Sequence, residues 1–313
     1  MHWNPVARTS ARTRVTSVLV LVACGLMLLY VGLLAMLWRI QERIVFQPPA
    51  HPPETHVDAT RVDYRASDGV SLFAYVVGDC RSARTVLLAF HGNADLARWF
   101  VPWATEVARR TGACVILPEY RGYDGLRPFP SYATSAVDAR AAFDYARETL
   151  GVPPSRMVFF GHSLGSAIAA ELAAVEMPHS LVLQSPFSTA RDMAARMFLP
   201  GLTLFWGAVS RVHFDTIARV RGLCAPVYVA HGDADLIIPV RMGREVFAAA
   251  ACPGELLIVH GAGHNDVAGV GGGAYWEWLA RAIRGEVAGA TGPGATGPGA
   301  TAPDAAAETR SAP

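Results

Sequence analysis

The sequence predicts an α/β fold, a mostly parallel sheet of about eight strands with helices on both faces, preceded by one transmembrane helix. Between residues 61 and 284, apolar strand-like runs alternate with helix-like runs, a pattern that is typical of βαβ units. The strand-like runs from residue 85 onward are continuously apolar, as expected for strands that are buried on both faces. Residues 15–38 form a long uncharged segment outside this alternating pattern.

The segment 15–38 has the length of a membrane span. At about 1.5 Å per residue, its 24 residues can cross a hydrocarbon core about 30 Å thick. Trp38 stands where an interfacial aromatic residue is expected. The alternative is a cleaved signal peptide, whose apolar region is about 7–15 residues long and ends in an A-x-A-like site. The length of the run and the absence of a clear cleavage site favour an uncleaved signal anchor, with the lipid bilayer as its partner.

The arginines around this span favour one orientation. Three arginines precede it within residues 1–14, whereas two follow it directly and are partly offset by Glu42. Because positive charge is retained inside, residues 1–14 are expected in the cytoplasm. The sequence contains no lysine and much alanine, which indicates a GC-rich bacterial source. We therefore expect a single-pass protein of the bacterial inner membrane, with its large domain on the periplasmic, extracytoplasmic side.

Composition sets the other boundaries. Residues 39–284 hold all the alternating runs and are predicted to form one folded domain. Residues 285–313 repeat Gly, Ala, Thr and Pro and contain almost no large apolar side chain. Such a segment cannot bury enough apolar surface to offset its ordering entropy, so a disordered tail is predicted.

Charge and cysteine content exclude some functions. The net charge of +1 gives no field that would attract nucleic acid, so no nucleic-acid partner is expected. The five cysteines lack metal-ligand spacing, so neither a metal nor another cofactor is expected. Cys114 is interpreted as a small residue of a buried strand. One disulfide among Cys80, Cys224 and Cys252 stays open if the domain lies in an oxidising compartment.

The predicted elements locate the reactive edge of the sheet. The strand-like runs are 61–66, 72–77, 85–90, 113–118, 157–160, 180–184, 227–230 and 255–260, and the helix-like runs lie near 95–111, 133–150, 164–176, 239–250 and 273–284. The first two strands are joined by a turn-like link and are expected to form an antiparallel entry to the sheet. Because ligands bind beyond the carboxyl ends of parallel strands, we expect the reactive residues directly after strands.

A G-x-S-x-G pattern places Ser163 directly after one of these strands. It follows the run MVFF and opens a helix-like run, which is the context of a nucleophile elbow. The turn is so tight that the positions two before and two after the serine need glycine, and Gly161 and Gly165 stand there. His162 completes the turn before the serine. A plain glycine-rich turn is the alternative, but the strand before and the helix after favour the elbow.

Two later strands end in candidates for a base and an acid. A serine needs a base to become nucleophilic, and in folds with this elbow the chain order is Ser, then Asp or Glu, then His. His264 lies in a glycine-rich loop beyond the last strand and is the predicted base, whereas His260 at the strand end is expected to be packed or hydrogen-bonded. The spacing H-G-x-x-D-x-x-I-P selects Asp235 as the acid, and Asp233 is expected to shape the turn.

An acyl-transfer site also needs donors for the oxyanion of the tetrahedral intermediate. One predicted donor is the backbone N–H of Leu164, the residue after the serine. The second should come from the loop after the run 85–90, and we expect the backbone N–H of Asn93, with Ala94 as the near alternative. His91 precedes the serine in the chain and is expected to have a structural role.

Together these motifs resemble the α/β-hydrolase superfamily, in particular its membrane-anchored branch of fungal bud-emergence-type proteins and single-span α/β-hydrolase-domain proteins of animals. The matching stretches are RIVFQPP, FHGNA, PEYRGYDG, PSYATSAVDARAAFDY, GHSLGSAIAAELA, LQSPFSTARDMA, FDTIARV, HGDADLIIP and GAGHND. The resemblance runs from about residue 38 to 284. The resemblance implies the α/β-hydrolase fold, with 39–284 as its catalytic domain, and a triad of Ser163, Asp235 and His264.

Two segments bear on the substrate. In such proteins the tyrosine-glycine loop continues with small residues, whereas here Arg127 and Phe129 are bulky and are expected near the pocket mouth. The segment 186–226 holds the usual lid position and carries several Met, Phe, Leu and Trp side chains. It forms either the packed face of a helix or an acyl-binding wall that contacts lipid.

The expected function is therefore hydrolysis of carboxylic ester or thioester bonds in small-molecule or lipid-like acyl substrates. Amide or peptide hydrolysis on the same triad is an alternative. A second alternative, from another class, is a non-catalytic membrane-tethered binding module, against which the intact set of three triad residues argues.

Overall fold

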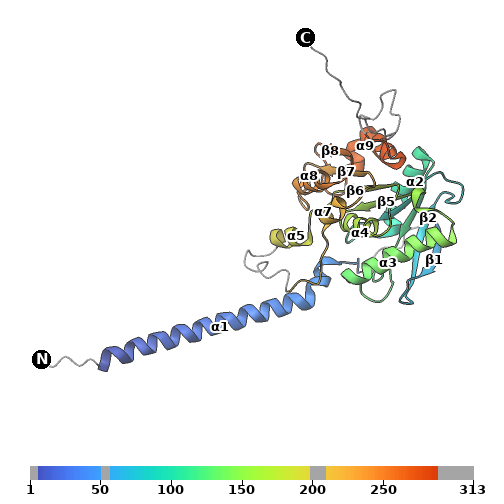
Figure 1. The fold of residues 1–313 in the computed structure, drawn as a ribbon. Coiled ribbons are helices and arrows are strands. Elements are labelled where there is room, and N and C mark those ends of the chain that lie inside the picture. Colours follow the sequence, from blue (N-terminus) through green and yellow to red (C-terminus); the bar gives the residue numbers. More distant parts are fainter. Residues whose placement is uncertain (1–5, 51–56, 198–208, 288–313) are drawn as a thin grey trace, which may run out of the picture.

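The structure, a computed structural model, describes residues 6–50, 57–197 and 209–287, with the backbone alone for 6–12. One sheet forms the centre, helices cover both of its faces, and α1 projects away from this body as a single long helix (Figure 1). The N-terminal end of α1 and the end of α9 lie on opposite sides of the molecule (Figure 1). The predicted fold class is confirmed.

The sheet has eight strands in the order β1-β2-β4-β3-β5-β6-β7-β8. These strands are β1 (Thr60–Arg65), β2 (Ser71–Val77), β3 (Val86–Phe90), β4 (Cys114–Pro118), β5 (Met157–His162), β6 (Ser180–Gln184), β7 (Val227–Gly232) and β8 (Pro253–Val259). Strand β2 pairs antiparallel with both β1 and β4, and all pairs from β4 to β8 are parallel. The predicted antiparallel entry is therefore present, and the parallel part aligns the carboxyl ends of β3, β5, β6, β7 and β8.

Helices alternate with these strands. They are α1 (Val6–Val45), α2 (Val101–Thr111), α3 (Tyr132–Asp144), α4 (Leu164–Ala173), α5 (Ala190–Met197), α7 (Thr216–Arg221), α8 (Val240–Ala249) and α9 (Val267–Arg284), with short helical turns at η1 (Ala97–Phe100), η2 (Tyr145–Thr149) and η3 (Pro154–Arg156). Local chemistry sets several ends. Ser131 and Thr134 form a capping box at the start of α3, and left-handed Gly112 and Gly285 end α2 and α9.

Two apolar layers hold the helices on the sheet. Helices α2 and α9 contact each other on one face, whereas α3, α4, α7 and α8 form a continuous layer on the other. Strand β3 supplies both layers, since Leu88 and Phe90 pack toward α4 and Leu87 and Ala89 pack toward α2 and α9. Successive side chains of a strand point to opposite faces, so a strand in the middle of this sheet must be apolar throughout. This is why the continuous apolar runs predicted its position correctly.

Helix α1 contains the predicted span 15–38 and continues beyond it. The part from Thr13 to Val45 is long and apolar enough to cross a membrane, with a mean hydropathy of 2.7 in its most apolar window, none of which is buried. The helix continues to Val45 because its last turns bind the folded body. Phe46, directly after the helix, is buried in the core with only 1% of its surface exposed. Glu42 forms an ion pair with Arg211 at 3.1 Å.

A disulfide joins Cys80 to Cys114, with the two Cα atoms 4.9 Å apart. Cys114 is buried in β4, as interpreted, but it also pairs with Cys80, which the sequence analysis had grouped with Cys224 and Cys252. Those two cysteines are free. The antiparallel pairing of β2 with β4 explains the partner. Val77 at the end of β2 lies opposite Val115, which brings the residues after β2 beside the first residue of β4. The two cysteines are 34 positions apart in the sequence, so no local pattern indicated that they pair.

Two predicted segments fall partly outside the described residues. The tail 285–313 is described only as far as residue 287, and the lid-position segment 186–226 is described except for 198–208.

We predict that loss of the disulfide destabilises the fold. Cys80→Ser should lower the free energy of unfolding by about 2–4 kcal/mol, since the loop that it closes restricts the unfolded chain. Denaturant unfolding of the full chain in detergent would measure this, with Cys252→Ser as a control that removes a free thiol. Equal stability of Cys80→Ser and wild type would contradict the prediction.

Candidate active site

Ser163 occupies a strained turn between β5 and α4. Its backbone has φ 53° and ψ −118°, a region that residues with side chains rarely adopt. The turn is stabilised on both sides, because the Ser163 N–H donates to the carbonyl of Gln184 at 3.0 Å and Ser166 donates to the Ser163 carbonyl. The strained backbone therefore presents the serine at the carboxyl end of the parallel sheet.

The glycines of the turn are required by close backbone contacts. A Cβ atom on Gly161 would lie 2.2 Å from the carbonyl oxygen of Gly165, and one on Gly165 would lie 2.2 Å from the carbonyl oxygen of Phe90. No side chain fits at these distances. Gly161 and Gly165 thus let α4 begin directly against β3 and β5, as expected from the G-x-S-x-G pattern.

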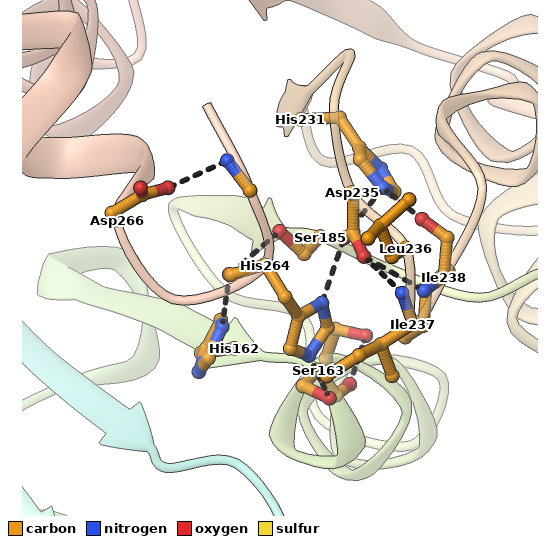
Figure 2. A network of polar contacts seen from close by, with 12 residues as sticks. His162, Ser163, Ser185, His231, Asp235, Leu236, Ile237, Ile238, His264 and Asp266 are labelled. Atoms are coloured by element: carbon orange, nitrogen blue, oxygen red, sulfur yellow. Dashed lines mark hydrogen bonds and ion pairs between the residues drawn. The ribbon is translucent and has the colours of Figure 1, made fainter. Parts of the chain in front are cut away.

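Ser163, His264 and Asp235 form one hydrogen-bonded chain (Figure 2). The Ser163 hydroxyl donates to His264 Nε2 at 2.8 Å, and His264 Nδ1 donates to Asp235 Oδ2 at 2.7 Å. Asp235 follows β7 and His264 follows β8, so three loops at the same edge of the sheet supply the three side chains. This is the geometry of a nucleophile, a base and an orienting acid.

The Asp235 carboxylate is held by four donors. Its Oδ1 accepts from the N–H groups of Ile237 and Ile238, both at 2.8 Å, and its Oδ2 accepts from His264 and lies 3.2 Å from His231 Nε2. Burial alone raises the pKa of Asp235, but the hydrogen bonds from His231 and His264 and the adjacent backbone donors outweigh it. The net pKa lies well below the ordinary value, so the group stays ionised.

The competing candidates after β7 and β8 pair with each other. His260 Nδ1 lies 2.7 Å from Asp233 Oδ2, and Asp233 Oδ1 accepts from the N–H of Gly261. His260 is therefore hydrogen-bonded and Asp233 shapes the turn, as the sequence indicated, although the His260 side chain is exposed and not packed. Neither contacts Ser163.

His162 holds the backbone of His264. Its Nε2 donates to the backbone carbonyl of His264 at 3.1 Å, and within the described residues its buried Nδ1 has no partner. Burial and the nearby His264 lower the pKa of His162 to about 4, so its ring is neutral at neutral pH. Gly92 leaves room for this ring, since a Cβ there would lie 3.0 Å from Nδ1.

The proposed oxyanion donors lie beside the serine. Asn93 and Leu164 line the same cavity as Ser163. The Asn93 side chain is fixed, because its Oδ1 accepts from the hydroxyl of Tyr123 and from the N–H of Gln47, both at 2.8 Å. The loop that carries Asn93 is thus tied to two other segments, one of which directly follows α1.

Glu119 holds the other end of this loop. Its Oε1 accepts from His91 Nε2 at 2.8 Å and its Oε2 accepts from the N–H of Ala97 at 3.0 Å. Burial lowers the pKa of His91, but the charge and hydrogen bond of Glu119 more than offset this and leave it raised. Because His91 Nδ1 also bonds the carbonyl of Gly92, both ring nitrogens face acceptors and the ring is best described as protonated. His91 therefore has the structural role expected for it.

A cavity of about 330 Å³ opens directly at Ser163. Its walls are almost entirely apolar and come from the end of α1, from α5 and from the segment after residue 208. Met193 and Met197 of the predicted lid-position segment line it, whereas Phe198, Leu199, Leu202, Leu204, Phe205 and Trp206 lie outside the described residues. The size is in the range of small-molecule pockets.

The tyrosine-glycine loop packs against the end of α1. Neither Arg127 nor Phe129 lines the cavity. Phe129 instead lies against the guanidinium of Arg43, 5.9 Å from its ring centroid, so the bulky loop meets the end of α1. The sequence could not place this loop because its partner is 86 positions earlier in the chain.

Three residues of the site were not identified as functional from the sequence. His231 and Glu119 lie in the quoted motifs HGDADLIIP and PEYRGYDG, at or just after strand ends, and that position could have identified both. Gln47 acts through its backbone N–H, which no side-chain pattern reveals. For metals, the described residues contain no group of three or more His, Cys, Asp or Glu side chains placed to hold an ion.

Comparison with known proteins identifies the family of this chain. A family model described as alpha/beta hydrolase fold matches residues 85–202. Two proteins of Mycobacterium tuberculosis, both described as uncharacterized, are 34% identical over 243 residues, which cover 75% of this chain and 84% of theirs. The chain belongs to the α/β-hydrolase family.

This α/β hydrolase also has relatives in the branch that its motifs indicated. Alpha/beta hydrolase domain-containing protein 17B of Xenopus laevis is 29% identical, with 65% of this chain and 68% of the relative covered. Protein bem46 of Schizosaccharomyces pombe is 28% identical, with 60% and 64% covered. The predicted resemblance to this branch is confirmed.

Solved structures agree at the level of the fold. An esterase of Pyrococcus furiosus aligns with a TM-score of 0.62 at 15% identity, covering 78% of this α/β hydrolase and 98% of the esterase. An esterase from Rhodococcus sp. aligns with a TM-score of 0.55 at 18% identity, covering 72% and 98%. At such identities the likeness establishes the shared fold.

The low pKa of His162 predicts a pH-dependent stability. The folded state binds fewer protons than the unfolded state between about pH 4 and the ordinary histidine pKa of 6.5. This contribution to stability is fully present above pH 6.5 and is lost as the pH falls toward 4, by up to about 3 kcal/mol. His162→Gln should therefore show a smaller loss of unfolding free energy between pH 7 and pH 4.5 than wild type.

Denaturant unfolding at the two pH values would measure the difference, with the exposed His213→Gln as the matched control. Parallel pH curves for wild type and His162→Gln would show that His162 does not titrate in this window.

Proposed function

We propose that this α/β hydrolase is a membrane-anchored serine hydrolase that cleaves carboxylic ester or thioester bonds of apolar acyl substrates. The observation that carries the proposal is the hydrogen-bonded chain from Ser163 through His264 to Asp235, which opens into an apolar cavity. Fold alone would not support an activity, but this constellation at the carboxyl edge of the sheet has the parts that acyl transfer requires.

In the first half of the reaction, Ser163 Oγ attacks the acyl carbonyl while His264 Nε2 takes the hydroxyl proton. His264 then gives this proton to the leaving alcohol or thiol, and the acyl group remains bonded to Ser163. Asp235 Oδ2 accepts a hydrogen bond from the Nδ1–H of His264 and stays ionised, which fixes the tautomer and stabilises the imidazolium. Its low pKa supports this role, since the carboxylate must stay charged while the imidazolium exists.

In the second half, a water molecule attacks the acyl-enzyme carbonyl and His264 takes its proton. The tetrahedral intermediate collapses, Ser163 leaves with the proton returned by His264, and the carboxylic acid is released. Both tetrahedral intermediates carry an oxyanion. The backbone N–H groups of Leu164 and Asn93 stabilise it, with Ala94 as the alternative donor of that loop, and each such donor contributes a factor of about 10²–10³ in rate.

The triad predicts covalent labelling by a serine-directed probe. The full chain in detergent should react with a fluorophosphonate, whereas Ser163→Ala and His264→Ala should not, because the first lacks the nucleophile and the second lacks the base. Ester hydrolysis should fall by roughly 10⁴-fold or more in both variants. Gel fluorescence and release of a fluorescent alcohol measure the two effects.

Ser82→Ala is the matched control, since Ser82 is exposed and bonds only Asp79. Folded wild-type protein that fails to label would overturn the proposal and favour a membrane-tethered binding module. Paired ester and amide substrates of the same acyl group then separate esterase from amidase activity.

The domain lies on the extracytoplasmic side in this proposal. The arginine bias around 15–38 supports that orientation. The Cys80–Cys114 disulfide supports it independently, because disulfides persist in oxidising compartments such as the periplasm and are rare in the cytosol.

Exposed Cys224 offers a test of this orientation. In spheroplasts that express the chain in a Cys252→Ser background, a membrane-impermeant maleimide should label Cys224, whereas Cys24 lies within the predicted span. The control is the same chain with Cys224→Ser, which should not label. Labelling that appears only after permeabilisation would place the domain in the cytoplasm.

A further inference from the structure

The end of α1 forms one wall of the cavity at Ser163. Leu37, Gln41 and Ile44 line it, and their spacing of four and three positions places them on one face of the helix. Trp38 and Val45 line it beside them. The helix predicted to cross the membrane is thus in contact with the same cavity as the nucleophile.

Helix α5 forms the facing wall. Ala190, Met193, Ala194 and Met197 line the cavity, and these positions again share one helical face. The cavity is therefore a groove bordered by two helix faces, and Ser163 and Leu164 also line it. Methionine side chains are flexible and unbranched, which suits contact with a chain that has many conformations.

The α1 wall is fixed in place by specific bonds. The Gln41 side chain donates to the Val209 carbonyl at 3.0 Å and accepts from the Arg211 N–H at 2.6 Å. Arg211 also stacks its guanidinium 5.2 Å from the ring centroid of Trp38. Just beyond the helix, the Gln47 N–H donates to Asn93 Oδ1, so the same segment that forms the wall also holds the loop of a proposed oxyanion donor.

The groove begins where the apolar span ends. Leu37 and Trp38 are the last two residues of the uncharged segment 15–38, so they lie at the bilayer boundary when that segment crosses the membrane. Apolar side chains are exposed beside the groove. Met197 is 59% exposed, Ile237 is 55% exposed, and Leu236 of the loop that carries Asp235 is 86% exposed. Large exposed apolar groups at one place mark a contact surface.

We infer that α1 is part of the substrate site and that the substrate is a lipid ester with a linear acyl chain, taken from the bilayer in which α1 is anchored. The inference rests on the proposed function and names its substrate class. The acyl chain lies in the groove between α1 and α5 and the ester carbonyl meets Ser163. One water molecule takes about 30 Å³ of liquid and a methylene group is of similar size, so the cavity of about 330 Å³ holds roughly ten carbons.

The test uses the full chain in vesicles of an ether-linked phosphatidylcholine, which the enzyme cannot hydrolyse. The probes are the butyrate and palmitate esters of 4-methylumbelliferone. Leu37→Trp fills the groove from α1 and should lower the ratio of palmitate to butyrate kcat/KM about tenfold or more. The control is Leu29→Trp, which places the same side chain at an exposed position of α1. Its ratio of palmitate to butyrate kcat/KM should equal that of wild type.

A second arm identifies the source of the chain. At constant total palmitate ester, a tenfold increase in host lipid should lower the rate about tenfold below saturation, because the enzyme then meets a more dilute ester in its own bilayer. A hydrolysis rate that does not change with the amount of host lipid would overturn the bilayer as the source of the ester. An unchanged ratio in Leu37→Trp, or an equal loss on both esters, would overturn the role of α1 in binding.

Fluorophosphonate labelling of each variant separates the two proposals. Wild type that does not label removes the proposed hydrolase activity, and the substrate class with it. Wild type that labels and hydrolyses both esters, with a ratio that Leu37→Trp does not change, removes only the role of α1.

Discussion

The close approach of α4 to the ends of β3 and β5 is the constraint on which the site depends. A Cβ atom on Gly161 or Gly165 would lie only 2.2 Å from a backbone oxygen, so this packing requires glycine two residues before and two residues after Ser163. The approach forces Ser163 into its strained conformation and brings the loop that carries Asn93 beside it. The strain is maintained because the elements on both sides belong to the buried parallel sheet, where neither strand can shift without breaking its ladder.

Much of this arrangement could be predicted from local pattern. Continuous apolar runs identify strands buried on both faces, and the alternation with helices identifies the parallel sheet. The order of that sheet then brings the ends of β5, β7 and β8 together, so Ser163, Asp235 and His264 could be nominated without coordinates. The spacing in the H-G-x-x-D motif selected between Asp233 and Asp235, and the structure gives each aspartate a different histidine partner.

What could not be predicted depends on contacts between distant segments. The Cys80–Cys114 disulfide follows from the register of β2 on β4, and no local pattern encodes a register between strands separated by a helix. Phe129 contacts Arg43 instead of the cavity because the end of α1 occupies that side of the domain. The uncharged run 15–38 likewise gave no indication that the helix continues to Val45 and borders the cavity, because the residues directly beyond Trp38 include four with polar or charged side chains, Arg39, Gln41, Glu42 and Arg43.

Helix α1 passes from its apolar segment to the folded body without a break, and this has a mechanical consequence. A flexible linker would let a domain change its orientation freely relative to the membrane. Here the helix is continuous, and its end is held to the folded body by the hydrogen bond of Gln41, the ion pair of Glu42 and the burial of Phe46, so it acts as a rigid connection. With α1 anchored as proposed, the domain would keep one tilt and one height over the bilayer, and its cavity would face the same small area of lipid at all times. For the lipid ester proposed as substrate, supply would then be two-dimensional, and lateral diffusion of lipid past α1 would set how often Ser163 meets an ester.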